Sequence, residues 1–280
     1  MTLIKSISGI RGTIGGKSNE NLTPVDTVLF AASFAMWCKQ SVNKEKIKVV
    51  VGRDARISGE MVKNLIVNTL VAYGADVVDI GLATTPTTEM AVVGEQADGG
   101  IIVTASHNPA QWNALKLLNR QGEFLNATEG SKILEMSEQQ SFDFATVDKL
   151  GQVLQKDYLL HHIEKTLQLP LVKVAEIKKR KLNIVVDAIN SVGAMAIPAL
   201  LEQLGVENVI VLNGDANGHF AHNPEPLDEH LSQIKEAVVR NKADLGIVVD
   251  PDVDRLAFIC EDGSMFGEEY TLVAVADYVL

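Results

Sequence analysis

Cysteine is nearly absent from this chain of 280 residues, which contains only Cys38 and Cys260. Each lies in an apolar run, so we expect two buried free thiols and no disulfide framework. Long hydrophobic runs are also missing, because no stretch is apolar enough to cross a bilayer and the N-terminus lacks a signal-peptide pattern. We therefore expect a cytoplasmic protein without a membrane partner.

Positive charge is scarce as well, since 25 Lys and Arg residues face 36 Asp and Glu residues, for a net charge of −11. This balance argues against a nucleic-acid partner, which would favour a basic face. It does not exclude a phosphorylated substrate, because such sites need only a few local cations and backbone N–H groups. With 46% hydrophobic and 22% charged residues, the composition is that of a globular protein, and the length favours about two domains.

Strand and helix patterns alternate along the chain, and the same order occurs twice. Runs of β-branched residues separated by helical patterns are typical of strands covered on both faces of a largely parallel sheet. We therefore predict a duplicated unit, with two similar three-layer α/β domains whose sheets are mixed and mostly parallel. The predicted strands lie at 47–51, 77–80, 101–103, 183–187, 209–212 and 245–249, and the predicted helices begin at Thr23, Ser58, Pro86, Lys156, Gly193 and Asp228.

The periodicity weakens between Phe142 and Asp157, which marks a boundary between domains. The four consecutive basic residues at 178–181 are predicted to form a solvated loop before a strand. The helical pattern after Glu268 has no C-terminal capping signal, so we expect that the chain was cut from a longer protein. The predicted domains are 1–150, 151–262 and, as the start of a third, 263–280.

A serine follows the strand predicted at 101–103, in the segment Thr104-Ala105-Ser106-His107-Asn108-Pro109. Such a sequence also suits a plain turn or helix-cap serine. A serine hydroxyl is a poor nucleophile near neutral pH and needs a base or a metal beside it. His107 is adjacent in sequence and would usually point elsewhere, and no Gly-x-Ser-x-Gly elbow occurs, which argues against a hydrolase triad.

Three carboxylates follow the last predicted strand at alternate positions, as Asp250, Asp252 and Asp254. Adjacent anions repel unless a cation lies among them, and a loop with this spacing can wrap Mg²⁺ or Ca²⁺. A calcium-binding helix–loop–helix is excluded because Arg255 stands where glycine is required and the flanks are strand-like. An acidic solvated turn and the Asp250-x-Asp252 nucleophile motif of haloacid dehalogenase-like phosphatases remain alternatives.

Both loops follow buried strands, and ligands of open α/β sheets bind at the carboxyl ends of strands. Together with two N-terminal motifs, they resemble the α-D-phosphohexomutase superfamily, which includes phosphoglucosamine mutase, phosphomannomutase and phosphoglucomutase. The motifs occur in family order and cover essentially the whole chain. They are Ile7-Ser8-Gly9-Ile10-Arg11-Gly12, Gly52-Arg53-Asp54, Thr104 to Pro109 followed by Asn113-x-x-Lys116, and Asp250-x-Asp252-x-Asp254-Arg255.

The resemblance implies an intramolecular phosphotransferase that interconverts hexose 1-phosphates and hexose 6-phosphates. Ser106 would carry the phosphate, and the phosphate would pass to a sugar hydroxyl through a hexose bisphosphate. The ligands of Mg²⁺ would be Asp250, Asp252, Asp254 and an oxygen on Ser106. This fits the physical logic of phosphoryl transfer, in which a metal neutralises charge and positioning supplies most of the rate.

Further site residues are implied by the same resemblance. Lys116 matches a family lysine proposed for acid–base work, and Arg11 and Arg255 match arginines that line the phosphoserine. His107 is expected to support the site or handle protons, whereas Arg53 and Asp54 brace loops. The pair His219 and His222 is assigned to a loop at the edge of the cleft, because a zinc site would need more ligands than the sequence offers nearby.

The chain departs from the family pattern in two ways. Pro251 and Val253 replace the usual glycines between the aspartates, so we expect a loop that does not use glycine-only conformations. The family's Gly-Glu-x-Ser-Gly-His and Arg-x-Ser-Gly-Thr-Glu-Pro motifs are absent, so the chain would supply two of four domains, lack domains 3 and 4, and be inactive alone. Within the family, the Thr104 to Pro109 loop and the Asn223-Pro224-Glu225-Pro226 segment most resemble phosphoglucosamine mutases of the archaeal type, with phosphomannomutase, phosphoglucomutase or a non-catalytic sugar-phosphate-binding module as alternatives.

Overall fold

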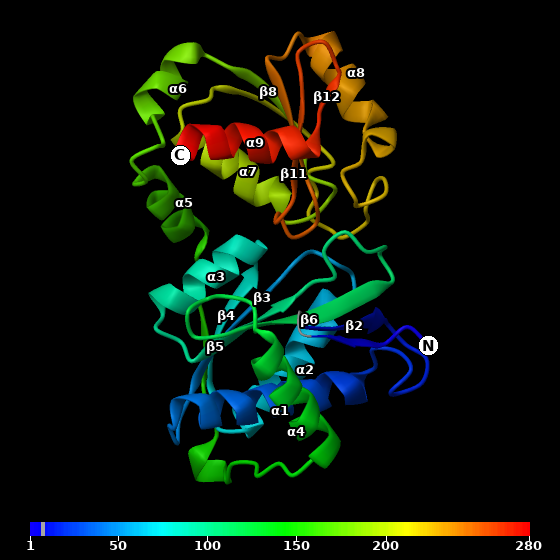
Figure 1. Cartoon of the computed structure of the whole chain (residues 1–280), viewed down its shortest axis with the longest axis vertical. Helices are drawn as coiled ribbons and strands as arrows, with labels where there is room; N and C mark the ends of the chain where they lie inside the picture. Colours follow the sequence, from blue (N-terminus) through cyan, green and yellow to red (C-terminus); the bar gives the residue numbers. More distant parts are fainter. Residues whose placement is uncertain (7–8) are drawn as a thin grey trace. The chain divides into compact units, whose positions relative to one another are not determined.

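The computed structural model describes residues 1–6 and 9–280, so Ile7 and Ser8 of the predicted N-terminal motif lie outside the described residues. The chain forms two compact units (Figure 1). The first unit contains Met1–Ala105 and Ala110–Tyr158, and the second contains Leu159–Leu280 together with the turn Ser106–Pro109. The serine turn therefore packs with the second unit although its flanking strands belong to the first. The domain boundaries at 150 and 262 remain predictions.

The first unit is built on a mixed sheet of seven strands in the order β1-β2-β6-β5-β3-β4-β7. The strands β5, β3, β4 and β7 are parallel neighbours, whereas β1, β2 and β6 join by antiparallel pairing. The strand bounds are β1 Ile4–Ser6, β2 Gly9–Thr13, β3 Lys48–Arg53, β4 Asp76–Leu82, β5 Gly99–Val103, β6 Trp112–Leu118 and β7 Val153–Gln155.

Helices cover both faces of this sheet, as the predicted three layers require. Alternate residues of β3 enter different cores: Val49 and Val51 pack with α1, α2 and α4, while Val50 packs with α3. The predicted start of the first helix is confirmed, because Thr23 and Asp26 form a capping box. The helix bounds are α1 Pro24–Val42, α2 Gly59–Ala72, α3 Thr85–Gly94 and α4 Ala127–Gln139, with a 3-10 turn at Val147–Lys149.

The second unit has a five-stranded sheet in the order β12-β11-β10-β8-β9, with apolar cores on both faces. One core lies under α8 around Ile234 and Val238, and the other lies near α7 around Val186 and Leu201. The bounds are α5 Leu159–Leu167, α6 Val174–Arg180, β8 Asn183–Asp187, α7 Gly193–Gln203, β9 Asn208–Leu212, α8 Ser232–Asn241, β10 Leu245–Val249, β11 Leu256–Ile259, β12 Met265–Phe266 and α9 Glu268–Val279.

Two local predictions in this unit are wrong. The basic residues predicted as a loop instead form the last turn of α6, with Lys181 as its C-cap. Cations at this end of a helix face the partial negative charge of its free carbonyl groups, which explains why they extend the helix. The helix predicted to begin at Asp228 is divided, because a 3-10 turn at Asp228–His230 precedes α8.

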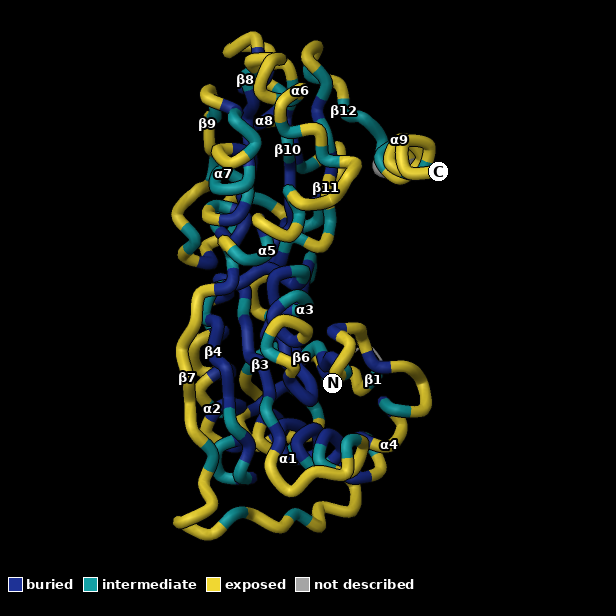
Figure 2. Tube along the Cα trace, turned by 90° about the vertical axis from the view of Figure 1, so that its left-hand side faces the viewer, coloured by how far each residue is buried: buried dark blue, intermediate teal, exposed yellow. Residues whose placement is uncertain are grey.

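The predicted internal duplication is confirmed by the strand order. The run β6-β5-β3-β4 of the first sheet has the same order and the same strand directions as β11-β10-β8-β9 of the second. The serine turn joins β5 to β6, and the aspartate turn joins β10 to β11. The two turns therefore occupy equivalent positions after equivalent buried strands. Figure 2 shows β4 and β10 as mostly buried and α9 as largely exposed.

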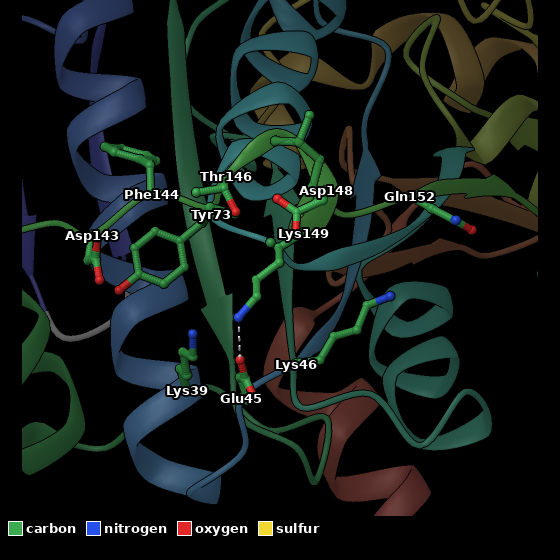
Figure 3. Close-up of a pocket in the computed structure, with 13 residues that line it drawn as sticks. Lys39, Glu45, Lys46, Tyr73, Asp143, Phe144, Thr146, Asp148, Lys149 and Gln152 are labelled. Atoms are coloured by element: carbon green, nitrogen blue, oxygen red, sulfur yellow. Dashed lines mark hydrogen bonds and ion pairs between the residues drawn. The ribbon is translucent and has the colours of Figure 1, made fainter.

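A cavity of about 650 Å³ lies in the first unit near the amino ends of β3 and β4, away from the edge where β5 leads into the serine turn. Lys39, Tyr73 and Lys149 are among the residues that line it (Figure 3). Its lysines are matched by carboxylates, as in the 3.1 Å ion pair of Lys149 with Glu45. Mixed charge of this kind gives no preference for an anion. No helix in the described part of the chain is long and apolar enough to span a membrane.

Candidate active site

The serine predicted to be the nucleophile lies in a tight turn at the end of a wholly buried strand. All five residues of β5 are buried, and Ser106 has only 7% of its surface exposed. Its φ of 49° lies in the left-handed region, which is uncommon for a residue other than glycine. Such backbone conformations cluster at functional sites, where the surrounding structure holds them in place.

The Ser106 hydroxyl is directed at the aspartate turn. Its Oγ donates a 2.7 Å hydrogen bond to Oδ2 of Asp250 and lies 3.4 Å from Oδ1 of Asp254. Ser106 and the three aspartates are separated by more than 140 residues in the sequence, yet they belong to the same compact unit. The structure thus brings together the two loops that the sequence singled out.

The aspartate turn curls around its own first carboxylate. Oδ1 of Asp250 accepts hydrogen bonds from the backbone N–H groups of Asp254 at 3.2 Å and Arg255 at 3.1 Å. Asp250 and Asp252 are fully buried, whereas Asp254 is exposed. Ligand oxygens of the three aspartates lie within 4.8 Å of one another. Three convergent hard oxygen donors, one of them open to solvent, fit a divalent cation such as Mg²⁺.

The electrostatics of the turn support the same interpretation. Burial raises the pKa of Asp250 well above its ordinary value, and the neighbouring charges of Asp252 and Asp254 raise it further. The hydrogen bond from Ser106 opposes this rise only in part. Gathering three carboxylates in a mostly buried turn costs free energy unless a cation compensates their charge. The donor set therefore suits a metal site better than an acidic surface turn.

The expectation about the backbone of this turn is wrong. Val253 has a φ of 60°, which is in the left-handed region that the sequence argument had excluded for valine. A β-branched residue in this region is strained. The turn needs this conformation because it must reverse between the antiparallel strands β10 and β11 while Asp250 accepts the N–H groups of the residues that follow.

His107 and Arg255 lie in the same electrostatic environment as the aspartates. Burial lowers the pKa of His107 and the positive charge of Arg255 lowers it further, against the opposing charges of Glu225, Asp254 and Asp252. Nδ1 of His107 is buried and has no hydrogen-bond partner among the described residues. The imidazole is therefore favoured in its neutral form near pH 7. Nη1 of Arg255 is held by Glu225 Oε1 at 3.2 Å.

The remaining predicted site residues, Arg11 and Lys116, belong to the first unit. They lie on the neighbouring strands β2 and β6, where Arg11 pairs directly with Ala114. Lys116 is two residues further along β6, so both cations project from the same face of the sheet. Lys116 Nζ lies 5.7 Å from the centre of the Phe124 ring.

A buried ion pair that the sequence did not reveal supports the strand end before the serine turn. Oδ2 of Asp54 accepts a 2.7 Å hydrogen bond from the Thr104 hydroxyl and a 3.1 Å bond from Arg56 Nε. Arg56, only 1% exposed, also donates to the Trp112 carbonyl at 3.1 Å. The predicted bracing role fits Asp54. Arg53 also contacts this segment, because its Nη1 donates to the Asp54 carbonyl at 2.9 Å while its Nη2 pairs with the exposed Glu60 at 2.9 Å. The Gly-Arg-Asp-x-Arg spacing was the only available signal for Arg56.

A second unpredicted group of contacts surrounds Asp187 at the end of β8. Its Oδ2 lies 3.1 Å from Nε2 of His222, and its Oδ1 accepts from Asn213 Nδ2 at 2.9 Å and from Ile189 N at 3.1 Å. Burial alone would lower the pKa of His222, but the hydrogen bond and charge of Asp187 raise it above its ordinary value. His222 thus holds a loop in place, in agreement with its assignment to a loop.

Comparison with known protein families identifies the family to which the sequence belongs. The chain matches "Phosphoglucomutase/phosphomannomutase, alpha/beta/alpha domain I" over residues 3–144 and "alpha/beta/alpha domain II" of the same family over residues 157–263. The chain belongs to the phosphoglucomutase/phosphomannomutase family. The predicted resemblance to phosphohexomutases and the predicted fold class are thereby confirmed.

Individual relatives agree with this assignment. A Thermococcus kodakarensis protein named "Phosphoglucomutase/phosphomannomutase" is 38% identical over 96% of this chain and 59% of its own length. A "Probable phosphoglucosamine mutase" of Pyrococcus abyssi is 33% identical over 98% of this chain and 57% of its own length. A Burkholderia thailandensis family structure superposes with a TM-score of 0.81 at 27% identity, over 99% of this chain and 60% of its own. The chain thus spans about 60% of the length of these relatives.

Proposed function

We propose that this chain carries the phosphoserine and metal-binding part of a phosphohexomutase, an enzyme that moves a phosphate between the 1- and 6-hydroxyls of a hexose. The observation that carries the proposal is the hydrogen bond from Ser106 Oγ to Asp250 inside a cluster of three carboxylates. A hydroxyl buried beside a cation site is the arrangement that phosphoryl transfer to serine requires, because attacking oxygen and charge compensation must be adjacent.

In the proposed reaction, the bond between phosphorus and Ser106 Oγ breaks as a bond to the free hydroxyl of a hexose phosphate forms. The hydroxyl proton passes to a base, for which Lys116 is the candidate that family membership supports. Ser106 Oγ keeps the electron pair of the broken bond, and a cation bound by the aspartates would stabilise its negative charge until the next phosphoryl group arrives. The resulting hexose bisphosphate then returns its other phosphate to Ser106, and the proton moves back to the product. A bound Mg²⁺, held by Asp250, Asp252, Asp254 and an oxygen on Ser106, would neutralise charge on the phosphoryl group.

Cationic and neutral groups around the turn have complementary proposed roles. Arg255 would pair with the phosphate on Ser106, as would Arg11 from the first unit. A guanidinium can bind two phosphate oxygens in parallel, which also orients the group. His107, favoured in its neutral form by burial and by Arg255, would exchange a proton with the phosphate or with the sugar hydroxyl.

For the substrate, we propose a hexosamine phosphate, with glucosamine phosphate first and mannose or glucose phosphates as alternatives. Support comes from relatives named "Probable phosphoglucosamine mutase" and from the Asn223-Pro224-Glu225-Pro226 segment. The relative with 38% identity bears the name of the alternative activities. Because the family's sugar-recognition and C-terminal phosphate-binding motifs do not occur in residues 1–280, we propose that this chain alone has negligible turnover.

Phosphorylation of the purified chain by a labelled hexose bisphosphate with Mg²⁺ tests this proposal. We expect one phosphate per chain, released slowly in acid and resistant to hydroxylamine, as a phosphoserine ester would be. Ser106→Ala should abolish labelling, and Asp252→Asn should reduce it strongly because the cation site is lost. Hydroxylamine-labile phosphate that persists in Ser106→Ala would refute the proposal and favour an aspartyl phosphatase. Mg²⁺ binding without any labelling would favour a binding module.

A further inference from the structure

One loop connects the surroundings of Asp187 with the aspartate turn. It runs from Asn213 after β9 to Leu227 before the 3-10 turn at Asp228–His230, and none of its residues is helical or in a strand. A segment of this length without secondary structure depends on individual hydrogen bonds to the elements around it. Asp187 and Asn190 hold its first part, and Arg255 contacts it near its end.

At its first anchor, the loop surrounds a carboxylate that is only 1% exposed. Asp187 accepts from Asn213 at the start of the loop and faces Nε2 of His222 in its middle. Nδ1 of His222 lies 2.8 Å from the Asn223 carbonyl, so both ring nitrogens face acceptors. The imidazole satisfies both contacts only when each nitrogen carries a hydrogen, which is the charged form. An ion pair between the buried Asp187 and the partly buried His222 thus fixes the loop against the end of β8.

At its second anchor, the loop contacts the residue that follows the metal-binding aspartates. Glu225 Oε1 holds Nη1 of Arg255 at 3.2 Å, and both side chains are 35% exposed. The Asn223 side chain accepts from Glu225 N at 3.1 Å, which orders the backbone just before the contact. The backbone N–H of Arg255 meanwhile donates to Asp250. The guanidinium therefore has a loop carboxylate as partner while its backbone belongs to the acidic turn.

The charges of Arg255, Asp252 and Asp254 all act on His107, so the guanidinium lies in the neighbourhood of these two aspartates, and loss of Glu225 would free it to pair with one of them. Asp254 is adjacent in sequence and exposed, and an arginine that pairs with it would compete with a cation for the same carboxylate. We propose that Glu225 is a positioning residue that keeps the Arg255 guanidinium out of the metal site, and that Asp187 and His222 fix the loop presenting it. The part of this inference that concerns phosphate binding rests on the proposed function; the part that concerns the cation does not.

Calorimetric titration of the chain with Mg²⁺ tests the inference directly. We expect Glu225→Gln to weaken Mg²⁺ binding by about fivefold, a typical size for coupling between neighbouring charged groups. Glu229→Gln is the matched control, since it removes the same charge from a nearby exposed side chain that contacts His230. The control should leave the dissociation constant unchanged. Equal weakening in both variants would reveal a general charge effect and overturn the inference.

A double-mutant cycle tests whether Glu225 affects Mg²⁺ binding through Arg255 or directly through its own negative charge. In an Arg255→Met background, Glu225→Gln should no longer change Mg²⁺ affinity, because the competing guanidinium is gone. An undiminished effect of Glu225→Gln in that background would refute the positioning role. His222→Gln should weaken Mg²⁺ binding in the same direction, and unchanged binding would remove the Asp187 anchor from the proposal. Circular dichroism confirms that each variant is folded.

The phosphoserine readout distinguishes this inference from the proposed function. If the chain is phosphorylated, Glu225→Gln should slow labelling even at saturating Mg²⁺, because Arg255 is no longer held for the phosphate. If the chain binds Mg²⁺ and the double-mutant cycle shows the predicted coupling between Glu225 and Arg255, but the chain never accepts phosphate, then the positioning role of Glu225 is supported and the proposed function is refuted. If labelling is normal and the cycle shows no coupling, the inference fails alone.

Discussion

Replacing one buried carboxylate of the aspartate turn should stabilise the protein without metal and remove its response to metal. In Asp252→Asn, the side chain keeps its shape and its amide can donate to Asp250, whose carboxyl already shares a hydrogen bond with Asp252. The substitution removes one of three charges whose ligand oxygens lie within 4.8 Å of one another. The perturbation therefore isolates the repulsion between carboxylates.

The size of the effect follows from this geometry. At 4.8 Å, the largest separation among these ligand oxygens, two full charges repel by about 3.5 kcal/mol at an effective dielectric constant of about 20. The raised pKa of Asp250 means that protonation already relieves part of this repulsion. We therefore expect Asp252→Asn to raise the free energy of unfolding by about 1–2 kcal/mol in the presence of a chelator.

Urea unfolding at neutral pH, first with chelator and then with Mg²⁺, measures both the effect of carboxylate repulsion on stability and the stabilisation by the bound cation. The unsubstituted protein should gain about 2.7 kcal/mol when free Mg²⁺ is about 100 times its dissociation constant, whereas the variant should gain almost nothing. The order of stability of the two proteins should thus reverse between the two conditions. A variant that is less stable than the parent in chelator would refute the repulsion argument. An equal gain of stability on adding Mg²⁺ would refute the assignment of Asp252 as a ligand.

Three further predictions use the same unfolding assay. Arg56→Met should cost about 3–5 kcal/mol, because it leaves the buried carboxylate of Asp54 without its charged partner. Val253→Gly should raise stability by about 0.5–1 kcal/mol, because relief of the strained positive φ exceeds the added flexibility of the unfolded chain. His222→Gln should be most destabilising below about pH 6.5, and the loss should shrink as the pH rises through the raised pKa of His222, where the stabilising charge on the imidazole disappears.

Each of these predictions has a control or an outcome that contradicts it. Lys46→Met removes a cation that is 58% exposed and pairs with Asp76, and it should cost less than about 1 kcal/mol; equal losses of stability in Arg56→Met and Lys46→Met would show that burial does not decide the cost. A loss of stability in Val253→Gly would mean that the valine side chain contributes more by packing than its backbone costs. A constant effect of His222→Gln between about pH 5.5 and 8.5 would exclude a charged imidazole.

Local sequence determined much of this protein. The β-branched runs that became β3, β8 and β10 are buried on both faces and needed no partner to be recognised. The Thr-Pro-x-Asp start of α1 carries its own capping hydrogen bonds. The serine and aspartate motifs are short and contiguous, and each one follows a buried strand directly, which places it at the carboxyl end of that strand. Patterns of this kind depend only on residues close together in the sequence, so the sequence alone contains them.

Only the tertiary structure decided how these loops are held. The bond from Ser106 to Asp250, the clamp of Thr104 by Asp54, and the hold of Glu225 on Arg255 all join residues that are distant in sequence. The positive φ of Val253 likewise follows from the demands of the turn and not from the preference of valine. Secondary-structure propensity depends on a few neighbouring residues. The long-range contacts named above depend instead on the strand order of the sheet, which determines which strand ends lie next to each other. The strand order is determined by the burial of all the apolar segments together, so no single sequence motif specifies it.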